Sequence, residues 1–196
     1  MILRPLATGM LLATMLVLSC QHPQPTAATQ ERNLYKAPFA AVFYDSLQEV
    51  LVAYDQLRNA LAREDTAAAN AAARRMQQKL DSLPLKTLAM NSDSLKRVEG
   101  STGSISAELD GLAGESTLAD KRDAFFMVSD MCLDLVQLTG WKGSTLYRIS
   151  DSGTANKTGA YWLSETSSGT ENPYTGKRST GTIITDTLHF HSVSAR

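Results

Sequence analysis

The clearest helical pattern in the chain lies in residues 39–63, FAAVFYDSLQEVLVAYDQLRNALAR. Its large apolar residues recur at intervals of three and four, so they line one side of a helix. These residues are Phe43, Leu47, Val50, Leu51, Tyr54, Leu57 and Leu61. A helix of this length with one apolar side needs other elements to cover that side, and the pattern therefore predicts a helical core.

A second and a third helical segment follow. Residues 65–66, Asp-Thr, offer an N-cap for an alanine-rich helix that Pro84 is expected to end. A weaker apolar pattern covers residues 92–112, where Gly100 and Gly103 could break or kink the helix.

The fourth segment begins at Thr117, which with Asp120 resembles a capping box. Its apolar pattern runs over residues 125–138, and Gly140 is a suitable terminator. Four helices with short connections predict an antiparallel four-helix bundle in residues 37–140.

The composition changes after Trp141 to glycine, serine, threonine, asparagine and tyrosine, and the helical periodicity stops. Residues 180–193 alternate in polarity and include β-branched residues, which favours short strands or an irregular segment. The predicted fold class is therefore all-α, with residues 141–196 as an irregular or short-β extension packed on the bundle.

The N-terminus has the features of an export signal. After Arg4, the apolar run of residues 6–18 is shorter than the ~20 residues that a membrane-spanning helix needs. Residues 17–20, VLSC, resemble the lipobox of bacterial lipoproteins. The resemblance implies that residues 1–19 are removed and that Cys20 carries lipid, on the periplasmic side of a cell envelope membrane. Whether that membrane is the inner or the outer one stays open.

Residues 21–33 are rich in Pro, Gln, Thr and Ala, so residues 20–36 are expected to be a flexible tether. If Cys20 is lipidated, Cys132 has no disulfide partner, and its apolar neighbours predict a buried, inert thiol. The 19 basic and 20 acidic residues are nearly balanced and form no basic run, which argues against nucleic acid as a partner.

Two C-terminal motifs suggest a family. Residues 159–164, GAYWLS, and 172–177, NPYTGK, resemble the C-terminal signature of domain-of-unknown-function family 3347. The alanine-rich second helix and residues 122–129, RDAFFMVS, are also similar to that family, so that the resemblance covers residues 39–182. Members occur as periplasmic lipoproteins and fused to copper and silver efflux adaptors, which implies periplasmic copper handling.

The soft metal ligands of that family are not matched. Its Cys-Pro-Met run near the first motif is replaced by residues 147–151, YRISD, while Ser179 and Thr182 stand at its later Met and Cys positions. Residues 141–196 contain no Cys or Met. Because Cu(I) prefers thiolate and thioether ligands, the resemblance extends to the scaffold and not to the copper site.

His189 and His191 are the two histidines of the predicted extension. In a strand, side chains two apart share a face, so both imidazoles could bind one Cu(II) or Zn(II) ion with Asp186 nearby. Two nitrogens are half of a metal site, and the alternative is that both side chains are simply solvated.

Four residues of the C-terminal motifs could line a ligand groove or pack the extension on the bundle. They are Tyr161, Trp162, Asn172 and Tyr174. The sequence shows no complete catalytic constellation, so neither an enzyme nor a resident cofactor is expected.

We therefore expect a non-enzymatic periplasmic lipoprotein, held on the membrane by its lipid, that acts as a binding or interaction module. The alternative is a structural envelope lipoprotein that docks a protein partner.

Overall fold

The computed structural model describes residues 34–151, 160–168, 171–176 and 181–192. All of them belong to one compact unit, residues 33–196. The predicted leader, Cys20, Gly159 and Ser179 lie outside the described residues.

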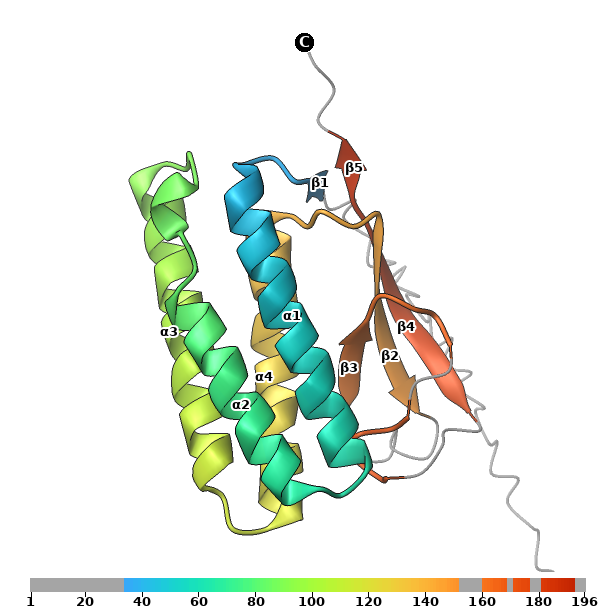
Figure 1. Ribbon diagram of the computed structural model, residues 1–196. Helices are drawn as coiled ribbons and strands as arrows, with labels where there is room; N and C mark the ends of the chain where they lie inside the picture. Colours follow the sequence, from blue (N-terminus) through green and yellow to red (C-terminus); the bar gives the residue numbers. More distant parts are fainter. Residues whose placement is uncertain (1–33, 152–159, 169–170, 177–180, 193–196) are drawn as a thin grey trace, which may run out of the picture. The chain divides into compact units, whose positions relative to one another are not determined.

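Four helices dominate this unit and confirm the predicted bundle. They are α1 (Ala41–Ala62), α2 (Thr66–Asp81), α3 (Ser92–Gly114) and α4 (Leu118–Thr139), with a short 3-10 turn, η1 (Leu85–Thr87), between α2 and α3. Each helix packs against the next in antiparallel order, and α1 also contacts α4 (Figure 1). No helix of the described residues is both long and apolar enough to cross a bilayer.

Side-chain caps begin three of the helices. The carboxylate of Asp65 accepts a hydrogen bond from the Ala68 amide at 2.9 Å, and the Thr117 hydroxyl accepts one from the Asp120 amide at 3.1 Å. Both caps were predicted from the sequence; the third, Asn91, was not. Each cap pairs an N–H group that the first helical turn leaves without a partner.

Helix α3 continues without a break through Gly100 and Gly103. Both glycines are exposed, and the opposite side of the helix is buried, so packing outweighs their low helix propensity. The buried side consists of Val98, Thr102, Ile105, Leu109, Leu112 and Ala113. Helix α2 ends at Asp81, three residues before Pro84.

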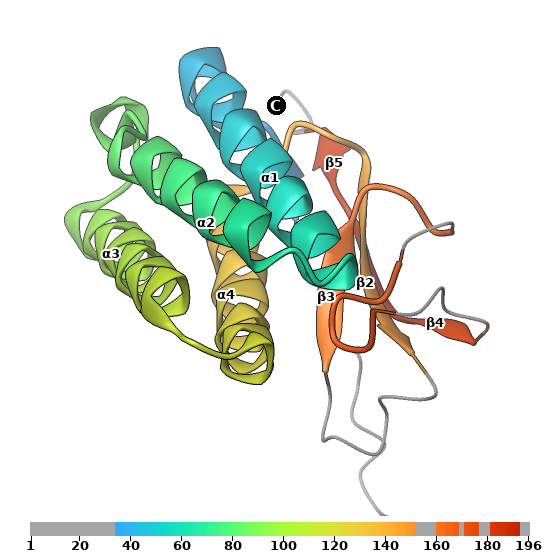
Figure 2. The ribbon, with the colours of Figure 1, turned by 60° about the horizontal axis from the view of Figure 1, so that its bottom comes forward.

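The C-terminal extension contains a three-stranded antiparallel sheet in the order β3-β2-β4. Its strands are β2 (Thr145–Asp151), β3 (Tyr161–Ser164) and β4 (Thr182–His189), and β2 pairs with both neighbours. Strand β3 contacts α4, and the sheet lies beside α1 and α4, away from α2 and α3 (Figure 2). The prediction of short strands in residues 180–193 is confirmed, whereas β2 and β3 were not foreseen.

A second, two-stranded sheet brings together the two ends of the described unit. Strand β1 (Tyr35–Lys36) pairs in parallel with β5 (His191–Ser192). Leu34, just before β1, is buried in the core. Residues 34–36 therefore belong to the folded unit, although the sequence predicted that they form the end of the tether.

Gly140 ends α4, as predicted, and its backbone explains the choice of residue. Its φ is +76°, a conformation that favours glycine. A Cβ atom there would lie 2.3 Å from the Tyr35 carbonyl oxygen and 2.8 Å from Cδ of Pro38. The turn from α4 to the sheet therefore passes too close to β1 for any side chain.

A matched pair of glycine substitutions tests this account of the turn. Gly140→Ala should lower the free energy of unfolding by about 3 kcal/mol, because it adds backbone strain and a steric clash. Gly103→Ala should raise it by about 1 kcal/mol, because a Cβ there meets nothing within 4 Å and alanine favours the helix. Urea unfolding followed by circular dichroism measures both. If both substitutions changed the free energy of unfolding equally, the requirement for glycine at position 140 would be contradicted.

Candidate functional site

Tyr54 lies where the bundle meets the sheet. Its side chain is buried, its ring is stacked on Phe125 with centroids 5.2 Å apart, and burial raises its pKa well above the ordinary range. Its hydroxyl lies 2.7 Å from Oγ of Ser129 in α4 and accepts a hydrogen bond from the Leu163 amide in β3 at 3.0 Å. Because the Ser129 hydroxyl donates to the Phe125 carbonyl, Tyr54 donates to Ser129. One phenol thus joins α1, α4 and β3.

Tyr161, Trp162 and Tyr174 lie in the same contact region. The Tyr161 hydroxyl donates to Oδ1 of Asp130 at 2.5 Å, and the Tyr174 hydroxyl donates to the Tyr161 carbonyl at 2.6 Å. Tyr161 and Trp162 are fully buried. Burial, and then the Asp130 carboxylate, raise the pKa of Tyr161 far above its usual value. The structure therefore places these aromatic residues in the packing of the extension on the bundle.

Asn172 is fully buried and holds the loop that follows β3. Its Nδ2 donates to Asp151 at 3.0 Å and its Oδ1 accepts from the Tyr174 amide at 2.8 Å. The next residue, Pro173, accepts a hydrogen bond at its carbonyl from Nε of Arg122 in α4 at 2.8 Å. Asn172 thus ties its loop to β2, and Pro173 ties it to the bundle, so both have a structural role.

His189 and His191 are both exposed but belong to different sheets. His189 ends β4 and pairs with β2, whereas His191 begins β5 and pairs with β1. Asp186, the proposed third ligand, accepts a hydrogen bond from the Thr187 amide at 2.8 Å. Among the described residues, no group of three or more His, Cys, Asp or Glu side chains could hold a metal ion.

Two sulfur-bearing side chains of the bundle are enclosed in the core. Cys132 is free and buried, and burial raises the pKa of its thiol to about 12, so the thiol is protonated at neutral pH and unreactive. Met76 is also fully buried. Met127 of α4, in contrast, is 46% exposed.

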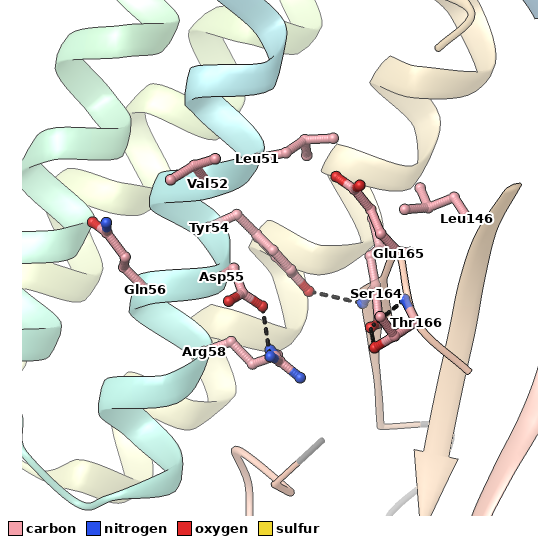
Figure 3. A pocket seen from close by; sticks show the side chains of 11 residues that line it. Leu51, Val52, Tyr54, Asp55, Gln56, Arg58, Leu146, Ser164, Glu165 and Thr166 are labelled. Carbon is pink, nitrogen blue, oxygen red and sulfur yellow. Dashed lines mark hydrogen bonds and ion pairs between the residues drawn. The ribbon is translucent and has the colours of Figure 1, made fainter. Parts of the chain in front are cut away.

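A cleft of about 430 Å³ opens between α1 and the end of β3. Its floor is apolar and buried and consists of Leu51, Tyr54, Leu146 and Leu163. Exposed residues form its rim, namely Val52, Asp55, Gln56, Glu165 and Thr166. Tyr54 and Arg58 reach from α1 toward Ser164 and Thr166 on the opposite wall (Figure 3).

Arg58 is the buried charged residue of this cleft, with only 5% of its surface exposed. Its Nη2 donates to Oδ1 of Asp55 at 2.5 Å and to Oδ1 of Asn59 at 3.1 Å. Its Nε and Nη1 are buried and have no hydrogen-bond partner among the described residues. Sequence reasoning missed this residue, although Arg58 follows Tyr54 by one helical turn and so interrupts the apolar side of α1.

Comparison with known families adds one result. Residues 50–143 match the model of a family described as a protein of unknown function, DUF3347. This part of the chain belongs to DUF3347. The family predicted from the sequence is confirmed. No curated protein and no solved structure matches the chain.

The DUF3347 match ends at Gly143, so it is shorter than the expected residues 39–182 and leaves out both C-terminal motifs. The structure nevertheless connects the two parts. Arg122 lies inside the matched range, and its guanidinium binds the Pro173 carbonyl outside that range. The extension is therefore tied to the DUF3347 bundle by hydrogen bonds from the bundle itself.

The role of Tyr54 can be tested with a conservative change. Tyr54→Phe keeps the stacked ring but leaves the buried Leu163 amide without a partner, so the free energy of unfolding should fall by about 2 kcal/mol. Tyr35→Phe is the control, because Tyr35 is half exposed, and it should change stability little. Guanidinium unfolding of both variants gives the comparison. Equal stability of the Tyr54 variant and the unmodified protein would show that this hydroxyl does not hold the sheet.

Proposed function

We propose that this chain is a non-enzymatic, lipid-anchored binding protein and that its ligand occupies the cleft between α1 and β3. The observation that supports the proposal is the guanidinium of Arg58, which is buried beside the cleft with Nε and Nη1 unpaired. The volume of the cleft falls within the range of small-molecule sites in proteins, about 300–1,000 Å³.

A buried, partly unpaired guanidinium is costly to the fold. Arginine stays protonated at every physiological pH, so it cannot avoid burial of its charge by losing a proton. A buried polar group without a partner costs about 1–3 kcal/mol, and more when it is charged. A residue that only packed α1 would have no need of that charge. Retaining it is reasonable if a ligand supplies the missing acceptors.

The remaining polar groups of the cleft support binding rather than catalysis. Asp55 is paired with Arg58, and Oε1 of Glu165 accepts a hydrogen bond from Gln48 at 3.2 Å. The residues that line the cleft in the described part of the chain include no histidine, cysteine or lysine. A nucleophile with an adjacent base, which covalent catalysis requires, is not assembled there.

The copper association implied by the family resemblance is not part of this proposal. The expected thiolate and thioether ligands are missing from residues 141–196, and Cys132 and Met76 are enclosed in the core. His189 and His191 stay a candidate pair for a borderline ion such as Cu(II) or Zn(II), which would bind weakly to two nitrogens.

One observation favours the alternative function, a structural envelope lipoprotein that docks a protein partner. Ile183 and Ile184 are adjacent and nearly half exposed on β4, an edge strand of the sheet. An exposed apolar edge strand can pair with a strand of another protein. The cleft and this edge are separate features, so experiments can distinguish the two functions.

The membrane anchor can be tested by metabolic labelling in bacterial cells with labelled palmitate. The protein should incorporate label, and Cys20→Ala should abolish it, because Cys20 is the predicted acylation site. Cys132→Ala is the matched control and should keep the label, since Cys132 is buried. Label that persists in the Cys20 variant would contradict lipidation at this residue.

The binding function can be tested by NMR on residues 33–196, which form one compact unit with its own core. The probe is a panel of small organic acids, amides, amines and sugars at millimolar concentration. At least one compound should shift the amide resonances of residues 51–58 and 163–166 together. If no member of the panel shifts both segments, the proposal is wrong.

A matched pair of variants tests whether the ligand binds in the cleft. Val52→Trp should block the cleft, because Val52 is on its rim and 48% exposed. Val42→Trp changes a similarly exposed valine of α1 that does not line the cleft, so this variant should bind like the unmodified protein. Equal binding by both variants would place the ligand elsewhere.

A further inference from the structure

We infer that the cleft binds a small organic monocarboxylate, with the carboxylate against Arg58 and the apolar part on Leu51 and Leu163. This inference rests on the proposed binding function and adds the chemical class of the ligand. It follows from the donors that are unpaired, from the charges around them and from the apolar floor.

The unpaired atoms are donors only. Nε and Nη1 of Arg58 carry N–H groups, and a guanidinium accepts no hydrogen bonds, so the missing partner must supply acceptor atoms. The existing ion pair uses only Nη2 and an Asp55 side chain that is 52% exposed, so it is partly screened by solvent. The Arg58 guanidinium can therefore offer a second anion both its positive charge and its unpaired N–H donors. Both donors are enclosed in this structure, so pairing them with a ligand in the cleft requires the guanidinium to turn about its terminal bonds.

The charge of the surroundings disfavours a dianion more strongly than a monoanion. Asp55 and Glu165 both border the cleft with Arg58, so the three side chains together carry one excess negative charge. A phosphate or another dianion would meet this excess at short range and would be repelled. A monocarboxylate gains the charge-assisted hydrogen bonds of Arg58 at a smaller electrostatic cost.

The floor of the cleft favours an apolar body behind the carboxylate. Leu51, Leu146 and Leu163 line it and are buried together with the ring of Tyr54. Removing apolar ligand surface from water on such a floor stabilises the complex by roughly 25 cal/mol per Å². A very small acid such as acetate lacks that surface and should bind weakly. A carboxylate with several apolar carbons can therefore contact both Arg58 and the apolar floor.

The closing experiment compares isosteric probes by NMR titration of residues 33–196. Hexanoate should shift the resonances of residues 51–58 and 163–166, and hexanamide should bind about tenfold more weakly or worse, because it lacks the charge that pairs with Arg58. Inorganic phosphate should cause no shift in either segment. Equal affinity for hexanoate and hexanamide, or tighter binding of phosphate, would overturn the carboxylate assignment.

Arginine variants complete the test. Arg58→Met keeps the length of the side chain and should weaken hexanoate binding about tenfold while leaving hexanamide binding unchanged. Arg97→Met, at an exposed position of α3, should leave both affinities unchanged. If the Arg58 variant does not fold, the comparison of hexanoate with hexanamide on the unmodified protein still decides.

The ligand class and the binding site can be refuted separately. Binding of hexanamide as tight as that of hexanoate would overturn the ligand class and leave the cleft as a binding site. If neither hexanoate nor any compound of the wider panel shifted the two segments, both the ligand class and the proposed function would be wrong.

Discussion

The attachment of the sheet to the bundle depends on the hydroxyl of Tyr54. Strand β3 is an edge strand, and the Leu163 amide points away from its partner strand, where a buried N–H group would otherwise be unpaired. Tyr54 of α1 accepts that hydrogen bond and donates one of its own to the Ser129 hydroxyl of α4. The chain of hydrogen bonds from Leu163 to the Phe125 carbonyl leaves no buried hydroxyl along it unsatisfied. The sheet, α1 and α4 are thereby fixed relative to one another.

The cleft is a consequence of the same contact. Tyr54 forms part of its floor and holds β3 against α1, while Ser164, Glu165 and Thr166 line the opposite wall. The segment that follows is held farther along by Asn172 and by Arg122, which binds the Pro173 carbonyl. Between these attachments Arg58, one helical turn beyond Tyr54, is buried without a full set of acceptors. The proposed site thus lies between helix α1 and strand β3, and the first residues after β3 complete its wall.

The helices were predictable because their signals are local. The period of the apolar residues and the caps at Asp65 and Thr117 act within a few residues, and the structure has both caps. Strand β3 was not predictable, because all four of its residues are buried and give no alternation. The roles of Asn172 and Arg122 depend on partners 21 and 51 residues away in the chain. Arg58 had one visible signal, a charge within an apolar stripe, but its unpaired nitrogens depend on the tertiary fold.

The most direct test of the central claim is hydrogen exchange at the Leu163 amide, measured by NMR on residues 33–196. If the Tyr54 hydroxyl joins β3 to the bundle, this amide should exchange only when the unit unfolds. Its free energy of exchange should then agree with those of the core amides of α1 to within about 1 kcal/mol. Rapid exchange at Leu163 while the amides of α1 and α4 stay protected would contradict the account, because it would show that the sheet opens without the bundle.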